Sequence, residues 1–202
     1  MSEPRSQLIA RGGWAEDRLL NRLKPPYGPR NTVSNLAYVL VGTGLAWAYQ
    51  DSSSAALAVS LWVLGTGSAL YHALKDRIAN RMDWTGMLMV FGSLAAHGFA
   101  PASPAMPWVM FGVSVLAALY YRAQGWISRD WWMVLLGLVA SAPVIVRAGW
   151  SVPLGLAWLA FAAAYGAWQL DKRGSNLVGL WGHALWHVLT AAGIGFLYIA
   201  QR

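Results

Sequence analysis

Seven long apolar segments, separated by short polar ones, constrain the fold of this chain more than any other feature of its sequence. Each has about 16–24 residues, close to the ~20 that an α-helix needs to cross the hydrocarbon core of a bilayer. None alternates polar and apolar residues as the strand of a membrane barrel would. We therefore predict seven membrane-spanning helices, at about residues 31–50, 55–74, 82–100, 105–121, 131–146, 152–170 and 177–200.

The composition agrees with a membrane protein. Of the 202 residues, 57% are hydrophobic and 11% are charged, less than half the ~25% charged share of a typical soluble domain. We expect an all-α, polytopic bundle as one domain over residues 31–202, preceded by a polar cytoplasmic or interfacial segment over residues 1–30. The chain has no cysteine, which excludes disulfides and thiol chemistry. Its first residues contain no apolar stretch of the kind that a cleavable signal peptide carries.

The basic residues predict the orientation of the bundle. Of the 15 lysines and arginines, 13 fall on the side that receives the N-terminus and the connections after the second, fourth and sixth helices, and the other two are Arg147 and Arg202. Cytoplasmic loops carry the excess of basic residues in membrane proteins. We therefore place the N-terminus in the cytoplasm and the C-terminus outside it. This distribution explains the net charge of +7 without a nucleic-acid partner.

Two histidines in the last apolar segment suggest a metal site. His183 and His187 are four residues apart, so their side chains share one face of a helix. Two neutral imidazoles on one face form half of a metal site. The residue after the first histidine is Ala184, whereas the H-E-x-x-H metalloprotease pattern has a glutamate there. A third ligand and a general base must therefore come from elsewhere in the chain.

Other polar residues of the apolar segments fall at the same end of the predicted bundle. The first, third and seventh helices begin on the cytoplasmic side, and the second helix ends there. His97 lies 14 residues beyond Asp83 on the same helix, about 21 Å away, and is excluded from this layer. The layer consists of Ser34, Asn35, Ser68, His72, Asp83, His183 and His187.

Each of these residues also has a simpler interpretation. A single histidine in a membrane helix usually packs or hydrogen-bonds, and a histidine pair can also ligate haem. Ser68 could serve close helix packing together with Gly65 and Gly67, and Asp83 could cap its helix. Ser34 and Asn35 could simply hydrogen-bond between helices. Three histidines, one aspartate and one serine in a single layer favour a functional site over these separate roles.

Four short motifs together resemble the alkaline ceramidases of the CREST superfamily of membrane hydrolases, which also includes the progestin and adipoQ receptors. They are N-T-V-S-N-L at 31–36, S-x-x-x-H at Ser68 and His72, R-x-D-W at 81–84 and H-x-x-x-H at His183 and His187. The resemblance extends in order over all seven predicted helices. It implies an intramembrane zinc ion held by His72, His183 and His187. It also implies that Asp83 lies next to the zinc-bound water and that Ser68 lies beside the metal.

One part of the sequence departs from that family. Animal alkaline ceramidases carry an acidic calcium motif, Asp-Trp-x-Glu-x-Asn, with a further glutamate before the N-T-V-S-N segment. The corresponding stretch, residues 13–18, reads G-W-A-E-D-R and keeps only Trp14 and Glu16, and Gly28 stands near the position of the later glutamate. A calcium ion needs six or more oxygen ligands. We therefore assign no calcium site and expect activity to survive a calcium-selective chelator.

The resemblance predicts a zinc-dependent amidohydrolase that cleaves the N-acyl bond of a ceramide-like lipid taken from the bilayer. Asp83 would act as general base and acid, and Ser68 would donate a hydrogen bond to the developing oxyanion. The main alternative is a zinc-stabilised lipid receptor or binding protein with little turnover, in which the same residues are structural. An intramembrane serine protease built on Ser68 with a histidine base is disfavoured, because it leaves His72 and Asp83 without roles.

Overall fold

The computed structural model describes residues 25–99, 103–123, 138–143, 145–146, 149–173 and 177–202. This part of the chain is helical and contains no strand, as the sequence predicts. Residues 1–24, which make up most of the predicted N-terminal segment, lie outside the described part of the chain. Residues 138–143 are helical. The other elements are α3 (Pro29–Ser34), α4 (Leu36–Tyr49), α5 (Ser52–Leu74), α6 (Arg77–Phe99), α7 (Met106–Ala123), α9 (Val152–Lys172), η1 (Gly179–Trp181) and α10 (Gly182–Ala200).

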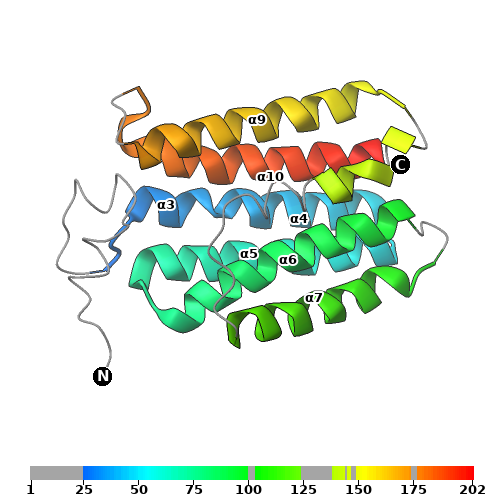
Figure 1. Ribbon diagram of the computed structural model, residues 1–202, viewed down its shortest axis with the longest axis horizontal. Coiled ribbons are helices and arrows are strands. Elements are labelled where there is room, and N and C mark those ends of the chain that lie inside the picture. Colours follow the sequence, from blue (N-terminus) through cyan, green and yellow to red (C-terminus); the bar gives the residue numbers. More distant parts are fainter. Residues whose placement is uncertain (1–24, 100–102, 124–137, 144, 147–148, 174–176) are drawn as a thin grey trace.

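The first apolar segment differs from its prediction because it forms two helices, α3 and α4, instead of one. The two are separated at Asn35, and α4 continues in the direction of α3 (Figure 1). The Asn35 side-chain amide donates a hydrogen bond to the Asn31 carbonyl at 2.6 Å, while its backbone N–H bonds to the Val33 carbonyl. The side chain thus replaces the backbone donor that a continuous helix would offer to Asn31.

The helices lie side by side, with their long axes roughly along one direction (Figure 1). α9 packs against α10, α10 against α3 and α4, and α5 against α6, with α7 beyond α6. The start of α3, the end of α5, the start of α6 and the start of α10 therefore meet at one end of the bundle (Figure 1). This is the end to which the sequence assigns the polar layer.

Two glycines allow α5 and α6 to approach closely. A Cβ on Gly86 of α6 would lie 2.4 Å from the Leu64 Cα of α5, and a Cβ on Gly67 of α5 would lie 2.6 Å from the Asp83 backbone nitrogen. Any larger residue would force the two backbones apart. Small residues at helix contacts are typical of membrane bundles. The close approach places Ser68, the neighbour of Gly67, next to Asp83.

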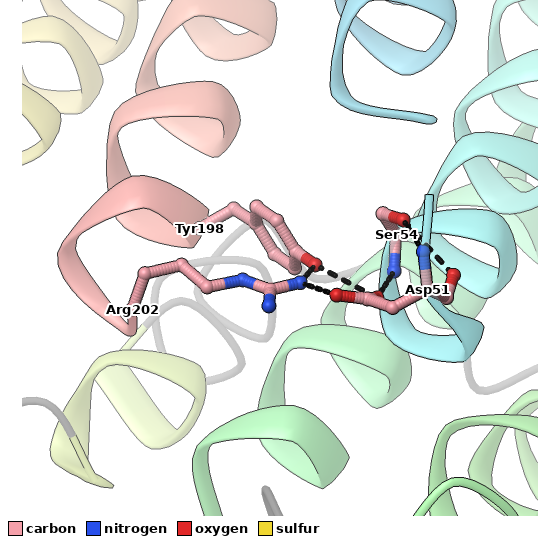
Figure 2. A network of polar contacts seen from close by, with 4 residues as sticks. All are labelled: Asp51, Ser54, Tyr198 and Arg202. Carbon is pink, nitrogen blue, oxygen red and sulfur yellow. Dashed lines mark hydrogen bonds and ion pairs between the residues drawn. The ribbon is translucent and has the colours of Figure 1, made fainter. Parts of the chain in front are cut away.

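The opposite end of the bundle is closed by a polar network that joins the end of α10 to the start of α5. Figure 2 shows Arg202 and Tyr198 reaching Asp51, the N-cap residue of α5. Arg202 donates hydrogen bonds to the Asp51 carboxylate and to the Tyr198 hydroxyl. Asp51 also accepts a bond from the Ser54 backbone N–H at 2.8 Å. His97 is buried at this end with its ring 5.0 Å from that of Tyr198, far along α6 from Asp83.

Two stretches of the described chain are long and apolar enough to cross a membrane, Ser52–Leu74 and Gly179–Ala200. In the most apolar 18-residue part of each stretch, more than half of the residues are buried, at 61% and 56%. Core helices of soluble proteins can have the same length and composition. Two such helices agree with a membrane location, and the seven-helix membrane bundle stays a prediction.

Candidate metal centre

Three histidines from two helices distant in sequence lie together inside the bundle. His72 occupies the last turn of α5, and His183 and His187 lie in the first turns of α10. The Nε2 atoms of His72 and His183 are 3.1 Å apart. One ring nitrogen from each of the three lies within 4.8 Å of the other two. Their side chains are only 1–5% exposed, so the group lies in the interior of the bundle.

This arrangement is suited to a metal ion. Neutral imidazole nitrogens ligate zinc at about 2.0–2.1 Å, which separates two nitrogens of a tetrahedral site by ~3.3 Å. The 3.1 Å between the Nε2 atoms of His72 and His183 is close to that spacing. A hydrogen bond between two of the imidazoles would satisfy the facing nitrogens of only two of the three histidines. A cation would accept a lone pair from the facing nitrogen of each of the three. The three histidines could therefore hold a metal ion, and three ligands leave a fourth position for water or substrate.

The residues of α3 support this group from one side. The Ser34 hydroxyl lies 2.8 Å from Nδ1 of His187 and also donates to the Asn31 carbonyl at 3.1 Å. Asn31 and Asn35 are almost completely buried. The Asn31 backbone carbonyl also lies within hydrogen-bonding range of the His187 ring. Ser34 and Asn35, which the sequence assigned to a supporting polar layer, thus surround one predicted metal ligand.

Ser68 and Asp83 form a pair beside the histidines. The Ser68 hydroxyl donates a hydrogen bond to the Asp83 carboxylate. Ser68 is buried on α5, one turn before His72, and Asp83 is half-buried near the start of α6. The two residues share the wall of one cavity with the three histidines. The structure therefore brings together every residue that the sequence assigned to catalysis or metal binding.

The cavity that contains these residues has a volume of about 650 Å³. Beyond the histidines it extends between α6, α9 and α10, where its walls are mostly aromatic and aliphatic. The residues that form this apolar part include Met87, Phe91, Trp158, Phe161, Trp186 and Ile194. Pockets of this size and character hold small-molecule or lipid ligands. An apolar chain in this space would bring its polar end towards the histidines.

The sequence interpretation overlooked one residue of this region, Tyr38. Its hydroxyl lies 2.5 Å from the Thr190 hydroxyl, and its ring centroid is 6.1 Å from that of His187. Tyr38 follows Ser34 by four residues and Asn31 by seven, so the helical spacing of 31, 34, 35 and 38 was the signal that could have identified it.

Two other predictions have different outcomes. His97 does not join the histidine group and lies at the opposite end of the bundle beside Tyr198, as expected. The stretch 13–18, on which the calcium prediction rests, lies outside the described residues. The absence of a calcium site therefore stays a prediction.

The fold and the site define an all-helical protein with a buried three-histidine group that could bind a metal ion. No known family model matches the chain, and a search of curated proteins likewise finds no match. Any functional assignment must therefore rest on the motifs and on the geometry of the site.

Proposed function

We propose that this chain is a membrane-embedded, zinc-dependent hydrolase that cleaves the N-acyl bond of a ceramide-like lipid. The observation that carries the proposal is the placement of the three histidines and the Ser68–Asp83 pair on the wall of one largely apolar cavity. A metal-ligand group, a carboxylate and a hydroxyl donor are the groups that amide hydrolysis requires. The motif resemblance to the alkaline ceramidases supports the class of lipid.

The proposal places all seven apolar segments across the membrane, with the N-terminus in the cytoplasm. The length and hydropathy of α5 and of the η1–α10 stretch support this placement, as does the 13-to-2 distribution of basic residues. Large apolar side chains are exposed on several helices; among them Trp47, Leu40 and Leu159 are 66–79% exposed and suit contact with lipid. The substrate would enter from the bilayer.

The residues of the site divide the chemistry between them. Zinc held by three neutral imidazoles would activate a water molecule and polarise the substrate carbonyl. Asp83 would accept the proton of the attacking water and deliver it to the amine nitrogen as the C–N bond breaks. In the free protein Ser68 donates its one hydroxyl proton to the Asp83 carboxylate. Once Asp83 has accepted the proton of the water, the Ser68 hydroxyl would turn and donate to the carbonyl oxygen as negative charge develops there. The apolar walls of the cavity would exclude bulk water from these steps.

The proposal is tested by measuring fatty-acid release and zinc content on the same purified protein. In detergent, the wild type should release fatty acid from N-acyl sphingoid bases and carry one zinc ion per chain. His72→Ala, His183→Ala and His187→Ala should each lose zinc and activity, whereas His97→Ala should keep both. Equal zinc content in all four variants would refute the metal site. A wild type that binds zinc but releases no fatty acid from amide or ester lipids would favour the zinc-stabilised lipid receptor.

A further inference from the structure

We propose that the break between α3 and α4 is a positioning device for His187: it holds the imidazole in the tautomer with its proton on Nδ1, which leaves Nε2 as the metal-binding atom. This inference rests on the proposed metal site and adds the means by which one ligand is prepared before metal binds. Ser34 and the Asn31 carbonyl are the positioning groups.

The contacts of the Ser34 hydroxyl assign the proton. Ser34 Oγ lies 3.1 Å from the Asn31 carbonyl oxygen and 2.8 Å from His187 Nδ1. A hydroxyl has one proton and two lone pairs, and a carbonyl oxygen can only accept. The Ser34 proton therefore goes to the Asn31 carbonyl, and the hydroxyl oxygen accepts from His187. His187 must then carry its proton on Nδ1.

The Asn31 carbonyl reinforces this assignment. It also lies within hydrogen-bonding range of the His187 ring, so the described residues place two oxygens, Ser34 Oγ and this carbonyl, beside that ring. An unprotonated Nδ1 would place its lone pair against the lone pairs of the carbonyl oxygen. With Nδ1 protonated, Nε2 keeps its lone pair on the side of the ring that faces His72 and His183, whose ring centroids lie 5.1 Å and 4.5 Å away.

The helix break is what makes this carbonyl available. In a continuous helix, the Asn31 carbonyl would accept the backbone N–H of the residue four positions later. That residue is Asn35, whose backbone N–H bonds instead to the Val33 carbonyl. The Asn35 side-chain amide keeps the Asn31 carbonyl in place by donating to it at 2.6 Å. The carbonyl is thus released from the helical ladder and held beside His187 by the Ser34 and Asn35 side chains.

His72 does not share this arrangement. Within the described residues, Nδ1 of His72 is buried and has no hydrogen-bond partner. The α3–α4 break therefore acts on His187 and leaves His72 to be oriented by packing on its own helix. Partners of metal-binding histidines fix the tautomer and orientation of the ring, and their loss typically weakens metal affinity by 10–100-fold.

Zinc affinity measured by competition with a chromophoric chelator tests the proposal without any assay of activity. Ser34→Ala should weaken zinc binding by about 10–100-fold, and Ser34→Thr should restore it because threonine keeps the hydroxyl. Asn35→Ala, which removes the other group that holds the Asn31 carbonyl, should weaken it as well. The matched control is Ser60→Ala: this buried serine bonds to the Ala56 carbonyl and to Ser93, away from the histidines, and zinc affinity should not change.

A second measurement reads the tautomer in the zinc-free protein. In protein labelled with ¹⁵N-histidine, His187 should show a protonated Nδ1 and an unprotonated Nε2 in the wild type and in Ser34→Thr. Ser34→Ala should show a mixture of tautomers. Wild-type zinc affinity together with an unchanged ¹⁵N pattern in both Ser34→Ala and Asn35→Ala would overturn the inference. If the wild type binds no zinc, the proposed function fails, while the ¹⁵N pattern still decides whether α3 sets the tautomer.

Discussion

Among the described residues that line the cavity, Asp83 is the one with an acidic side chain. The groups around its carboxylate suit proton transfer. Its carboxylate accepts a hydrogen bond from Ser68, which holds it against α5. The histidines on the facing helices do not depend on this carboxylate for their position, because their closest contacts are with one another and with α3. The chemical role of Asp83 can therefore be separated from metal binding by substitution.

The first prediction concerns this residue. Asp83→Asn keeps the shape of the side chain and removes the proton acceptor, so hydrolysis should slow by about 10²–10⁴-fold while zinc stays bound. Ser68→Ala should slow it less, by roughly 10–10³-fold, because one of several hydrogen-bond donors is lost. Fatty-acid release followed by mass spectrometry, together with zinc content, provides both readouts. An Asp83→Asn protein that holds full zinc and hydrolyses at the wild-type rate would refute the mechanism.

At the scale of the elements, the position of the site depends on how closely α5 and α6 pack. The Cβ that a side chain would add at Gly86 falls 2.4 Å from Leu64 Cα and 2.6 Å from its backbone nitrogen. Backbone atoms cannot move aside as the end of a flexible side chain can. Even one added methyl group must therefore separate the two helices that carry Ser68 and Asp83.

Gly86→Ala should accordingly destabilise the protein by about 1–3 kcal/mol, the usual cost of overpacking, and should also reduce hydrolysis. The matched control is Gly44→Ala on α4, where a Cβ would meet no atom within 4 Å. There the higher helix propensity of alanine should leave stability unchanged or slightly increased. Thermal unfolding in detergent compares the two variants, and equal midpoints would show that α5 and α6 can separate without cost.

The connection between the end of α10 and the start of α5 should make stability depend on acid pH. Partial burial acts to raise the pKa of Asp51, but hydrogen bonds from Ser54 and Arg202 and the charge of Arg202 outweigh it, so the pKa lies below its ordinary value of 3.8. A carboxylate with a lowered folded-state pKa stabilises the protein above its unfolded-state pKa, and this contribution is lost as the pH falls through the folded-state value.

Asp51→Asn keeps a side-chain oxygen for the N-cap and removes the ion pair with Arg202. Both side chains are about one-third exposed, at 35% and 31%, so solvent screening limits the loss at neutral pH to roughly 0.2–1 kcal/mol. The difference in unfolding midpoint between wild type and variant should be constant from pH 7 to about 5 and should shrink below about pH 4. A difference that grows as the pH falls would contradict this account.

At the scale of the whole molecule, the orientation in the membrane determines from which side the site is reached. The three histidines and the Ser68–Asp83 pair lie at the end of the bundle where α3 begins and α5 ends (Figure 1). The helix ends on that side carry Lys75, Arg77 and Lys172, whereas Arg202 lies at the other end. With the proposed membrane placement, the positive-inside rule predicts that the site lies near the cytoplasmic surface.

A topology reporter tests this placement directly. A reporter fused after Arg202 should give an extracytoplasmic signal, because 13 of the 15 basic residues fall on the opposite side of the predicted bundle. A second reporter inserted between α5 and α6, near Asp76, should give a cytoplasmic signal. The reverse pair of signals would invert the orientation and move the site to the outer surface, while leaving its chemistry unchanged.

Most of the helices, and the residues that could form the site, could be predicted from the amino-acid sequence. Long apolar segments can satisfy their backbone groups only as helices, so the positions of α5, α6, α9 and α10 followed from composition. Helical periodicity put His183 and His187 on one face. The alternating direction of successive helices then placed His72 and Asp83 in the same layer, because a side chain near a helix end must lie at that end of a bundle.

Which of these groups are in contact depends on how the helices pack in the folded protein. The 3.1 Å between His72 and His183 depends on how α5 and α10 pack, and periodicity carries no information about the partner of a helix. At the break, the side-chain amide and the backbone N–H of Asn35 are both possible donors to the Asn31 carbonyl. In the folded protein the side-chain amide donates to it, and the backbone N–H bonds to the Val33 carbonyl. The approach of Ser34 to His187 joins residues 153 positions apart and follows from that break. Such contacts are set by the folded arrangement of the helices and not by the pattern along any one of them.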